Sequence, residues 1–148
     1  MRNKLKYYIM IFAFLIRLII CILLPAKMDL DPRWYYDTAL KITTEKSFSV
    51  IPIKPPFYPI FLSFIFSIFK PSIFVVQVVQ CIIDCFTILF IYLFCKNVLD
   101  KPKIGIIASL ITSIDPFLVY FVREIMPETL TAFLIISSCY FVSLGFCT

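Results

Sequence analysis

Charged residues that could do chemistry gather in two short stretches between apolar blocks of the sequence. The first stretch holds the acids Asp29 and Asp31 and, further on, Lys54. The second holds Arg123 and Glu128. A carboxylate can accept a proton from a hydroxyl group, and a basic side chain can bind a phosphate. These residue types therefore suit acid–base chemistry and phosphate binding, although each also has a structural interpretation.

Asp31 is the first of these candidates. It precedes Pro32, and this pair is typical of a helix start because a carboxylate accepts free backbone N–H groups and proline suits the first helical position. A helix beginning there would place Asp31, Tyr35 and Ala39 on one face. On spacing alone the sequence favours a cap over a catalytic acid at Asp31, and Asp29 is the second candidate acid.

Lys54 is set among prolines in the sequence Lys54-Pro55-Pro56-Phe57-Tyr58-Pro59. The prolines rule out regular helix and predict an extended approach to the next apolar block. A lysine at that edge can contact lipid phosphates in general, or it can neutralise one particular phosphate in a site.

The second stretch has equally open interpretations. Glu128 follows Pro127, where a helix dipole would favour a carboxylate, so a cap and a site acid are weighed evenly. Arg123 could be a second phosphate contact or an anchor at a membrane interface, and the anchor is favoured.

The elements that must position these residues are long and apolar. Hydrophobic residues make up 61% of the chain, against about 45–50% in soluble domains. The long apolar blocks lie at 7–25, 72–95, 104–121 and 129–147, and each is close to the ~20 residues that cross a bilayer core. The sequence predicts an all-α membrane protein, with residues 1–148 forming one transmembrane region of about four helices.

A shorter apolar block at 57–69 decides the topology. As a helix it would be about 20 Å long, against a hydrocarbon core of ~30 Å. If this block does not span, the three lysines of 96–103 face the cytoplasm, as the positive-inside rule prefers. We therefore predict a cytoplasmic amino terminus, a long outside loop at 26–71 carrying juxtamembrane helices, and a second outside turn on the same face.

Polar residues inside the predicted spans need partners, because a charge at a helix centre costs about 2.5–3.5 kcal/mol on insertion scales. Arg17 and Asp84 lie at similar depth, which predicts a structural ion pair between the first and second spans. Gln77 and Gln80 are predicted to hydrogen-bond between helices. Asp115, followed by a proline, predicts a break in the third span.

Several classes of function are disfavoured by composition. There is no histidine, so neither His-based catalysis nor a His-ligated metal is predicted. The net charge is +5, but Lys and Arg lie at the edges of apolar blocks instead of on one soluble face, so nucleic acid is not a predicted partner. Membrane lipid is.

The order of the motifs resembles a known group of enzymes. Asp31-x-x-x-Tyr35-x-x-x-Ala39, then Lys54-Pro55-Pro56-x-Tyr58-Pro59 and an apolar helix, is similar to the amino-terminal part of the GT-C glycosyltransferases that use polyprenyl-phosphate sugars. This group includes protein O-mannosyltransferases and lipid A aminoarabinose transferases. The resemblance covers roughly residues 7–135 and implies that the chain is a portion of a larger transmembrane domain.

The resemblance implies a role for particular residues. Asp31 matches the loop acid that acts as general base on the acceptor hydroxyl, with Asp29 as the alternative. Lys54 matches the basic residue that contacts the lipid-linked phosphate and stabilises the leaving group. The further candidate substrate-binding residues are Tyr35, Tyr58, Arg123 and Glu128.

The implied reaction moves a sugar from a polyprenyl-phosphate carrier to an unidentified acceptor on the extracytoplasmic side. The lipid-linked sugar is the expected donor and partner, and participation of a divalent metal is left open. The Phe-, Ile- and Lys-rich, Gly-poor composition favours a bacterial inner membrane. Two alternatives are a small non-enzymatic scaffold or subunit, and a transporter fragment that would depend on Arg17, Asp84 and Asp115.

Overall fold

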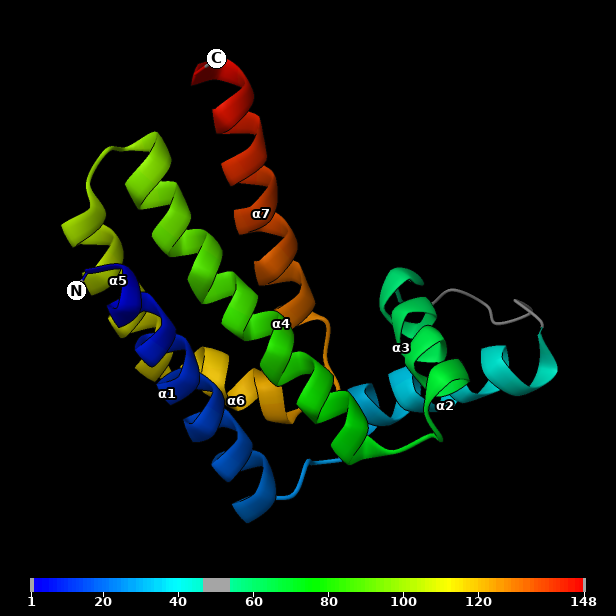
Figure 1. The fold of residues 1–148 in the computed structure, drawn as a ribbon. Helices are drawn as coiled ribbons and strands as arrows, with labels where there is room; N and C mark the ends of the chain where they lie inside the picture. The colour runs from blue at the N-terminus through cyan, green and yellow to red at the C-terminus, as the bar shows by residue number, and fades with distance from the viewer. Residues whose placement is uncertain (1, 47–53, 148) are drawn as a thin grey trace.

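The helices follow the apolar blocks of the sequence. The computed structural model describes residues 2–46 and 54–147, and within these ranges all regular structure is helical. The elements are α1 Arg2–Leu23, α2 Leu30–Glu45, α3 Phe57–Ile68, α4 Ile73–Leu93, the π-helical turn η1 Phe94–Val98, α5 Pro102–Ile114, α6 Pro116–Arg123 and α7 Glu128–Cys147 (Figure 1). The predicted all-α fold class is confirmed, although residues 47–53 of the predicted outside loop lie outside the described ranges.

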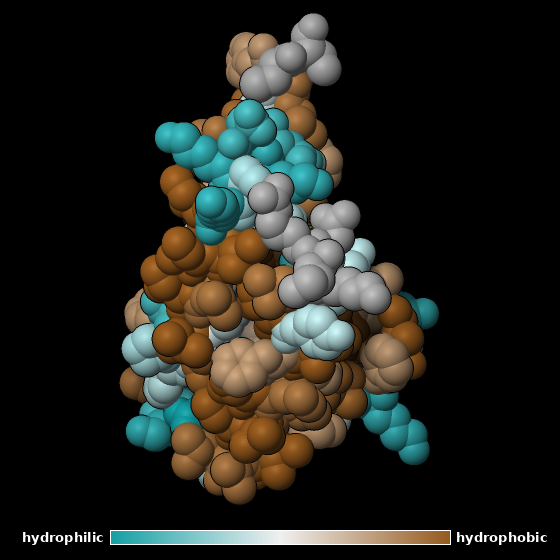
Figure 2. All heavy atoms as spheres, turned by 60° about the vertical axis from the view of Figure 1, so that its left-hand side comes forward, coloured by the Kyte–Doolittle hydropathy of each residue, from teal (hydrophilic) through white to brown (hydrophobic). Residues whose placement is uncertain are grey.

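Three helices of the described chain are long and apolar enough to cross a membrane: α1, α4 and α7. The pair α5 and α6 passes the same test together but is bent by 51°, which gives a fourth crossing if the pair counts as one span. Large apolar side chains such as Leu15, Ile111 and Phe141 are exposed on these helices, and Figure 2 shows hydrophobic residues covering most of the face it presents. The chain is an integral, multi-pass membrane protein.

The bend between α5 and α6 occurs at Asp115, as predicted. Proline at position 116 cannot donate to the helix ladder and starts a new helix. The Asp115 carboxylate caps that helix by accepting hydrogen bonds from the backbone N–H groups of Phe117 and Leu118 at 2.9 and 3.0 Å. The predicted break in the apolar block 104–121 is therefore confirmed, and the block forms two helices, α5 and α6, joined at Asp115.

The short helix α3 packs against α2 at one end of the bundle, to the side of the long helices (Figure 1). Their shared core contains Tyr35, Ala39 and Leu62, and it also contains Val76 at the start of α4. The apolar block at 57–69 thus forms one short helix, which confirms that it is too short to count as a full span.

The two loop regions lie at the same end of the bundle. In Figure 1 α1 ends and α4 begins at the lower end of the bundle, and α7 begins part of the way along α4 from that end. The backbone N–H of Lys27 donates to Glu124 Oε2 at 3.0 Å. For the described parts of the first loop, 26–46 and 54–71, the face shared with 122–129 is confirmed, and which side of the membrane it occupies stays a prediction.

The ion pair between Arg17 and Asp84 joins α1 to α4, as predicted, with both side chains at most 1% exposed. Arg17 also donates to the backbone oxygens of Ser113 and Thr112 at 2.9 and 3.2 Å. These carbonyls lie in the last turn of α5, where the helix runs out of N–H partners, and that of Thr112 also accepts the backbone N–H of Asp115 at 3.4 Å. Arg17 therefore stabilises both the charge of Asp84 and the broken helix.

Candidate functional site

The centre of the candidate site is an ion pair between Lys54 and Asp31. Helix α2 begins at Leu30, with Asp29 in the N-cap position, so Asp31 lies inside the first turn. The predicted cap at Asp31 is wrong. The helix starts earlier than the Asp-Pro signal implied, and the carboxylate turns to Lys54, a partner that local sequence does not reveal.

Two aromatic rings surround the lysine. Lys54 Nζ lies 5.7 Å from the ring centroid of Trp34 and 5.4 Å from that of Tyr35. Such cation–π contacts hold an ammonium without consuming its hydrogen-bond donors. The Lys54 side chain is 24% exposed and that of Asp31 is 56% exposed, so the ion pair opens to the surface. We call Lys54, Asp31, Trp34 and Tyr35 the lysine site.

Tyr58 supports the lysine site from behind. Its ring meets that of Tyr35 edge-on, at 5.2 Å between centroids and 89° between planes. Burial raises the pKa of Tyr58 well above its ordinary value of 10.0, the charge of Glu128 raises it further, and a backbone interaction with Met126 opposes the rise. Burial also raises the pKa of Tyr35, against the effect of Lys54. Both phenols therefore stay protonated at neutral pH.

Two glutamines of α4 connect this side to the second loop region. Gln80 Oε1 accepts a hydrogen bond from the hydroxyl of Tyr58 at 2.6 Å. Gln80 Nε2 donates hydrogen bonds to the backbone oxygens of Val122 and Glu124 at 2.9 and 2.8 Å. Gln77 Nε2 donates to the backbone oxygen of Arg123 at 2.9 Å. The predicted hydrogen bonding between helical segments is confirmed.

Arg123 is not at the surface. Its side chain is 9% exposed, its guanidinium pairs with Glu124 and lies 4.8 Å from the Tyr120 ring centroid. The interface-anchor interpretation of Arg123 is therefore wrong, because a buried and paired guanidinium does not reach lipid headgroups. Sequence reasoning assigned no role to Glu124, although an acid directly beside Arg123 was the available signal.

Glu128 is the first residue of α7. It lies close enough to the lysine site for its charge to raise the pKa of Tyr35 and of Tyr58 and for its carboxylate to interact with that of Asp31. Its Oε2 is buried without a hydrogen-bond partner in the described chain, and such an atom normally finds one. The structure thus brings Glu128 together with Asp31 and the tyrosines, while Arg123 is separately paired.

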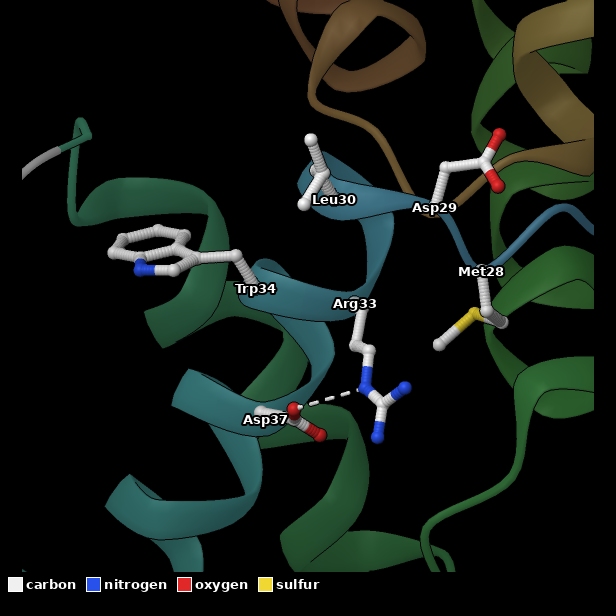
Figure 3. A pocket seen from close by; sticks show the side chains of 6 residues that line it. All are labelled: Met28, Asp29, Leu30, Arg33, Trp34 and Asp37. Atoms are coloured by element: carbon white, nitrogen blue, oxygen red, sulfur yellow. Dashed lines mark ion pairs between the residues drawn. The ribbon is translucent and has the colours of Figure 1, made fainter.

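Two cavities adjoin the start of α2. The larger, about 670 Å³, is lined by Met28, Asp29, Leu30, Arg33, Trp34 and Asp37 (Figure 3). In that view Arg33 turns to Asp37, at 3.7 Å, and the Asp29 carboxylate points away from the pair. The smaller, about 220 Å³, is lined by Lys27, Asp29, Pro32, Tyr120, Phe121, Glu124 and Met126. Asp29 lines both cavities, whereas Asp31 faces Lys54.

No group of three or more acids and cysteines in the described residues could hold a metal ion. What the site offers is a lysine held beside aromatic rings, a half-exposed carboxylate next to it, and a second carboxylate with a free buried oxygen. This arrangement can bind a phosphate and accept a proton at neighbouring positions.

Comparison with known proteins gives one match. The sequence model of the family described as dolichyl-phosphate-mannose-protein mannosyltransferase matches residues 53–146. The matched range contains Lys54, Tyr58, Gln80 and Glu128, and Asp31 precedes it. No curated protein and no solved structure matches the chain.

Proposed function

Because this chain belongs to the dolichyl-phosphate-mannose-protein mannosyltransferase family, we propose that it binds a polyprenyl-phosphate sugar and transfers the sugar to an acceptor on the extracytoplasmic side. The observation that carries this proposal is the lysine site, with Lys54 held over Trp34 and Tyr35 beside Asp31. Family membership does not favour the alternatives of a scaffold or a transporter fragment.

Lys54 is the proposed contact for the donor phosphate. Its ammonium is already desolvated on one side by two aromatic rings, and its present partner, Asp31, is half-exposed. The donor phosphodiester carries one negative charge and two non-bridging oxygens, as the Asp31 carboxylate does, so it can take the place of Asp31 at the ammonium. The polyprenyl phosphate that leaves is a monoester with more charge and one more terminal oxygen, so it would bind the lysine more strongly. During transfer the lysine would stabilise the negative charge that develops on the leaving polyprenyl phosphate.

Asp31 is the proposed general base. It would take the proton of the acceptor hydroxyl, whose oxygen then bonds to the anomeric carbon while the bond from that carbon to the phosphate oxygen breaks. The phosphate leaves with the electron pair. Asp29, which lines both cavities, is the alternative base.

The other predicted site residues receive supporting roles. Glu128 Oε2, which lacks a partner in the described chain, would accept a hydrogen bond from a substrate hydroxyl. Tyr35 and Tyr58 would hold Lys54 from behind, and Arg123 would act through Glu124 and not on the phosphate directly. The proposed setting is a bacterial plasma membrane with the amino terminus in the cytoplasm.

Donor binding can be tested directly because Trp34 is the only tryptophan of the chain and lies against Lys54. Titration of the detergent-solubilised protein with a short polyprenyl phosphate should change the Trp34 emission. Lys54→Gln should remove this response. The matched controls are Lys41→Gln, which removes an exposed lysine of α2, the helix that carries Trp34, and titration with the uncharged polyprenol. Binding to Lys54→Gln at the wild-type affinity would overturn the donor assignment.

The base is tested by sugar transfer in membranes that contain the protein and a radiolabelled polyprenyl-phosphate sugar. Asp31→Asn should abolish transfer while leaving the membrane level of the protein and the Trp34 response in place. Asp29→Asn is the matched variant, two residues away on the same segment. If Asp31→Asn transfers normally and Asp29→Asn does not, the base is Asp29.

A further inference from the structure

We infer that Gln80 is a positioning residue for the lysine site, holding Lys54 in place through Tyr58. The inference rests on the proposed role of Lys54 in phosphate binding. Gln80 touches neither Lys54 nor Asp31 itself, and it belongs to a helix that the motif around Lys54 does not include.

A continuous series of contacts runs from Lys54 to Gln80. Lys54 Nζ lies 5.4 Å from the Tyr35 ring centroid, and the Tyr35 ring meets the Tyr58 ring edge-on at 5.2 Å. The Tyr58 hydroxyl then donates to Gln80 Oε1 at 2.6 Å. Tyr35, Tyr58 and Gln80 are all buried, at 6%, 2% and 1% exposure, so each side chain is fixed by its neighbours.

The backbone between Lys54 and Tyr58 also restricts where Lys54 can lie relative to Tyr58. Pro55 and Pro56 have ring-locked φ angles, which removes most of the freedom of this short link. Pro56 is the N-cap residue of α3, with φ −78° and ψ −13°, and its oxygen accepts the N–H of Ile60 at 3.2 Å. The extended approach predicted from the prolines up to Pro59 is therefore wrong from Pro56 on, because proline suits the first turn of a helix. When Tyr58 is fixed, the helix start is fixed, and Lys54 has little room to move.

Only a glutamine satisfies all the groups around position 80. Its single oxygen accepts Tyr58, and both hydrogens of its Nε2 go to backbone carbonyls, those of Val122 and Glu124. A glutamate could accept from Tyr58 but could not donate to the two carbonyls, and a methionine could do neither. The orientation of the amide is thereby determined, and with it the place where the Tyr58 hydroxyl must sit.

Gln77 provides a matched comparison, one turn earlier on α4. It is also buried, at 3% exposure, and it donates to the backbone oxygen of Arg123, not to Tyr58. If the glutamines served only to join α4 to the carboxyl end of α6 and the residue after it, then loss of either one should have the same consequence. If Gln80 positions Lys54, its loss should affect phosphate binding and the loss of Gln77 should not.

The test is a double-mutant cycle with Tyr58→Phe and Gln80→Met, read by the Trp34 response to a polyprenyl phosphate. Gln80→Met should weaken binding about tenfold, the change expected for one lost hydrogen-bonded constraint of ~1.4 kcal/mol. Tyr58→Phe should weaken it in the same direction. The double variant should bind no more weakly than Gln80→Met, because both changes break the same link. Gln77→Met should bind as the wild type does.

To separate misfolding from a specific loss of phosphate binding, the affinity is measured only on the monodisperse fraction of each variant. Far-UV circular dichroism checks that the helix content of that fraction is unchanged. Tyr58→Phe, which keeps the ring and its contact with Tyr35, tests the link even if Gln80→Met does not fold. Wild-type affinity in Tyr58→Phe, additive losses in the double variant, or an equal loss in Gln77→Met would each overturn the positioning role. A normal affinity in Lys54→Gln would instead remove the proposed phosphate site itself.

Discussion

Among the described residues, two ion pairs join segments distant in sequence, and their surroundings are opposite. Arg17 and Asp84 lie within the spans, at most 1% exposed, with Arg17 also bound to backbone carbonyls. Lys54 and Asp31 lie at the loop end, at 24% and 56% exposure. The buried pair cannot exchange partners without exposing a charge to an apolar interior. The exposed pair can exchange partners, because water and a ligand can reach its charges. An ion pair is therefore a structural link between Arg17 and Asp84 and a candidate site between Lys54 and Asp31.

The largest effect is expected from breaking the buried pair on one side. Arg17→Met leaves Asp84 buried and unpaired, which should lower the free energy of unfolding by about 3–5 kcal/mol. Unfolding in mixed detergent micelles, followed by circular dichroism, measures the change. Adding Asp84→Leu should restore most of the loss, but not all, because the carbonyls of Thr112 and Ser113 still lose the hydrogen bonds that Arg17 donates. A double variant as unstable as the single one would contradict this account.

At the exposed pair, Lys54 and Asp31, we expect a large effect on phosphate binding and a small effect on stability. Lys54→Gln should reduce polyprenyl-phosphate affinity at least tenfold, which corresponds to about 1.4 kcal/mol, and should change the free energy of unfolding by less than about 1 kcal/mol. Raising the salt concentration should also weaken binding to the wild type, since exposed charges are screened. Binding that ignores salt would argue against Lys54 as the phosphate contact.

Tyr58, behind the exposed pair, should respond to alkali. Its pKa is raised in the folded protein, chiefly by burial, so the folded state keeps the proton above pH 10 while the unfolded chain releases it. Stability should therefore fall as the pH rises above about 10, by at most about 1.4 kcal/mol per pH unit for this one group. Tyr58→Phe should flatten that part of the pH profile, and an unchanged slope between pH 10 and 11 would count against a buried phenol.

The smallest effect is expected at a third ion pair. Arg33 and Asp37 are one turn apart on α2 and are 73% and 55% exposed. Arg33→Gln should change the free energy of unfolding by no more than about 0.5 kcal/mol, and the Trp34 response to polyprenyl phosphate should be unaltered. A large loss of affinity would move the phosphate contact from Lys54 to the cavity that Arg33 lines.

The spans and the buried pair could be predicted from the sequence with little help. Block length against bilayer thickness identified α1, α4 and α7, and the short α3. The cost of a charge inside a membrane paired Arg17 with Asp84. The proline after Asp115 predicted the break, although not that the third crossing would become two helices bent by 51°.

The candidate site was only partly predictable. The sequence predicted Asp31, Lys54 and Glu128 as candidate site residues, and the structure brings them together. The predictions that Asp31 caps a helix and that Arg123 anchors the protein at the membrane interface were wrong. Asp31 lies inside the first turn of α2 and pairs with Lys54, and the Arg123 side chain is buried beside Glu124. The link from Tyr58 through Gln80 to Val122 and Glu124 was not visible at all.

The sequence by itself thus determined the helices and their membrane setting, because hydrophobic length and the cost of buried charge are read along one segment at a time. Tertiary structure alone decided that Asp31 pairs with Lys54 and that Arg123 pairs inward with Glu124. It also decided that Gln80 joins Tyr58 to the backbone of Val122 and Glu124, which follow Gln80 by 42 and 44 residues in sequence. These choices depend on which segments meet at the loop end and on the direction of each side chain there, and neither is encoded in local spacing.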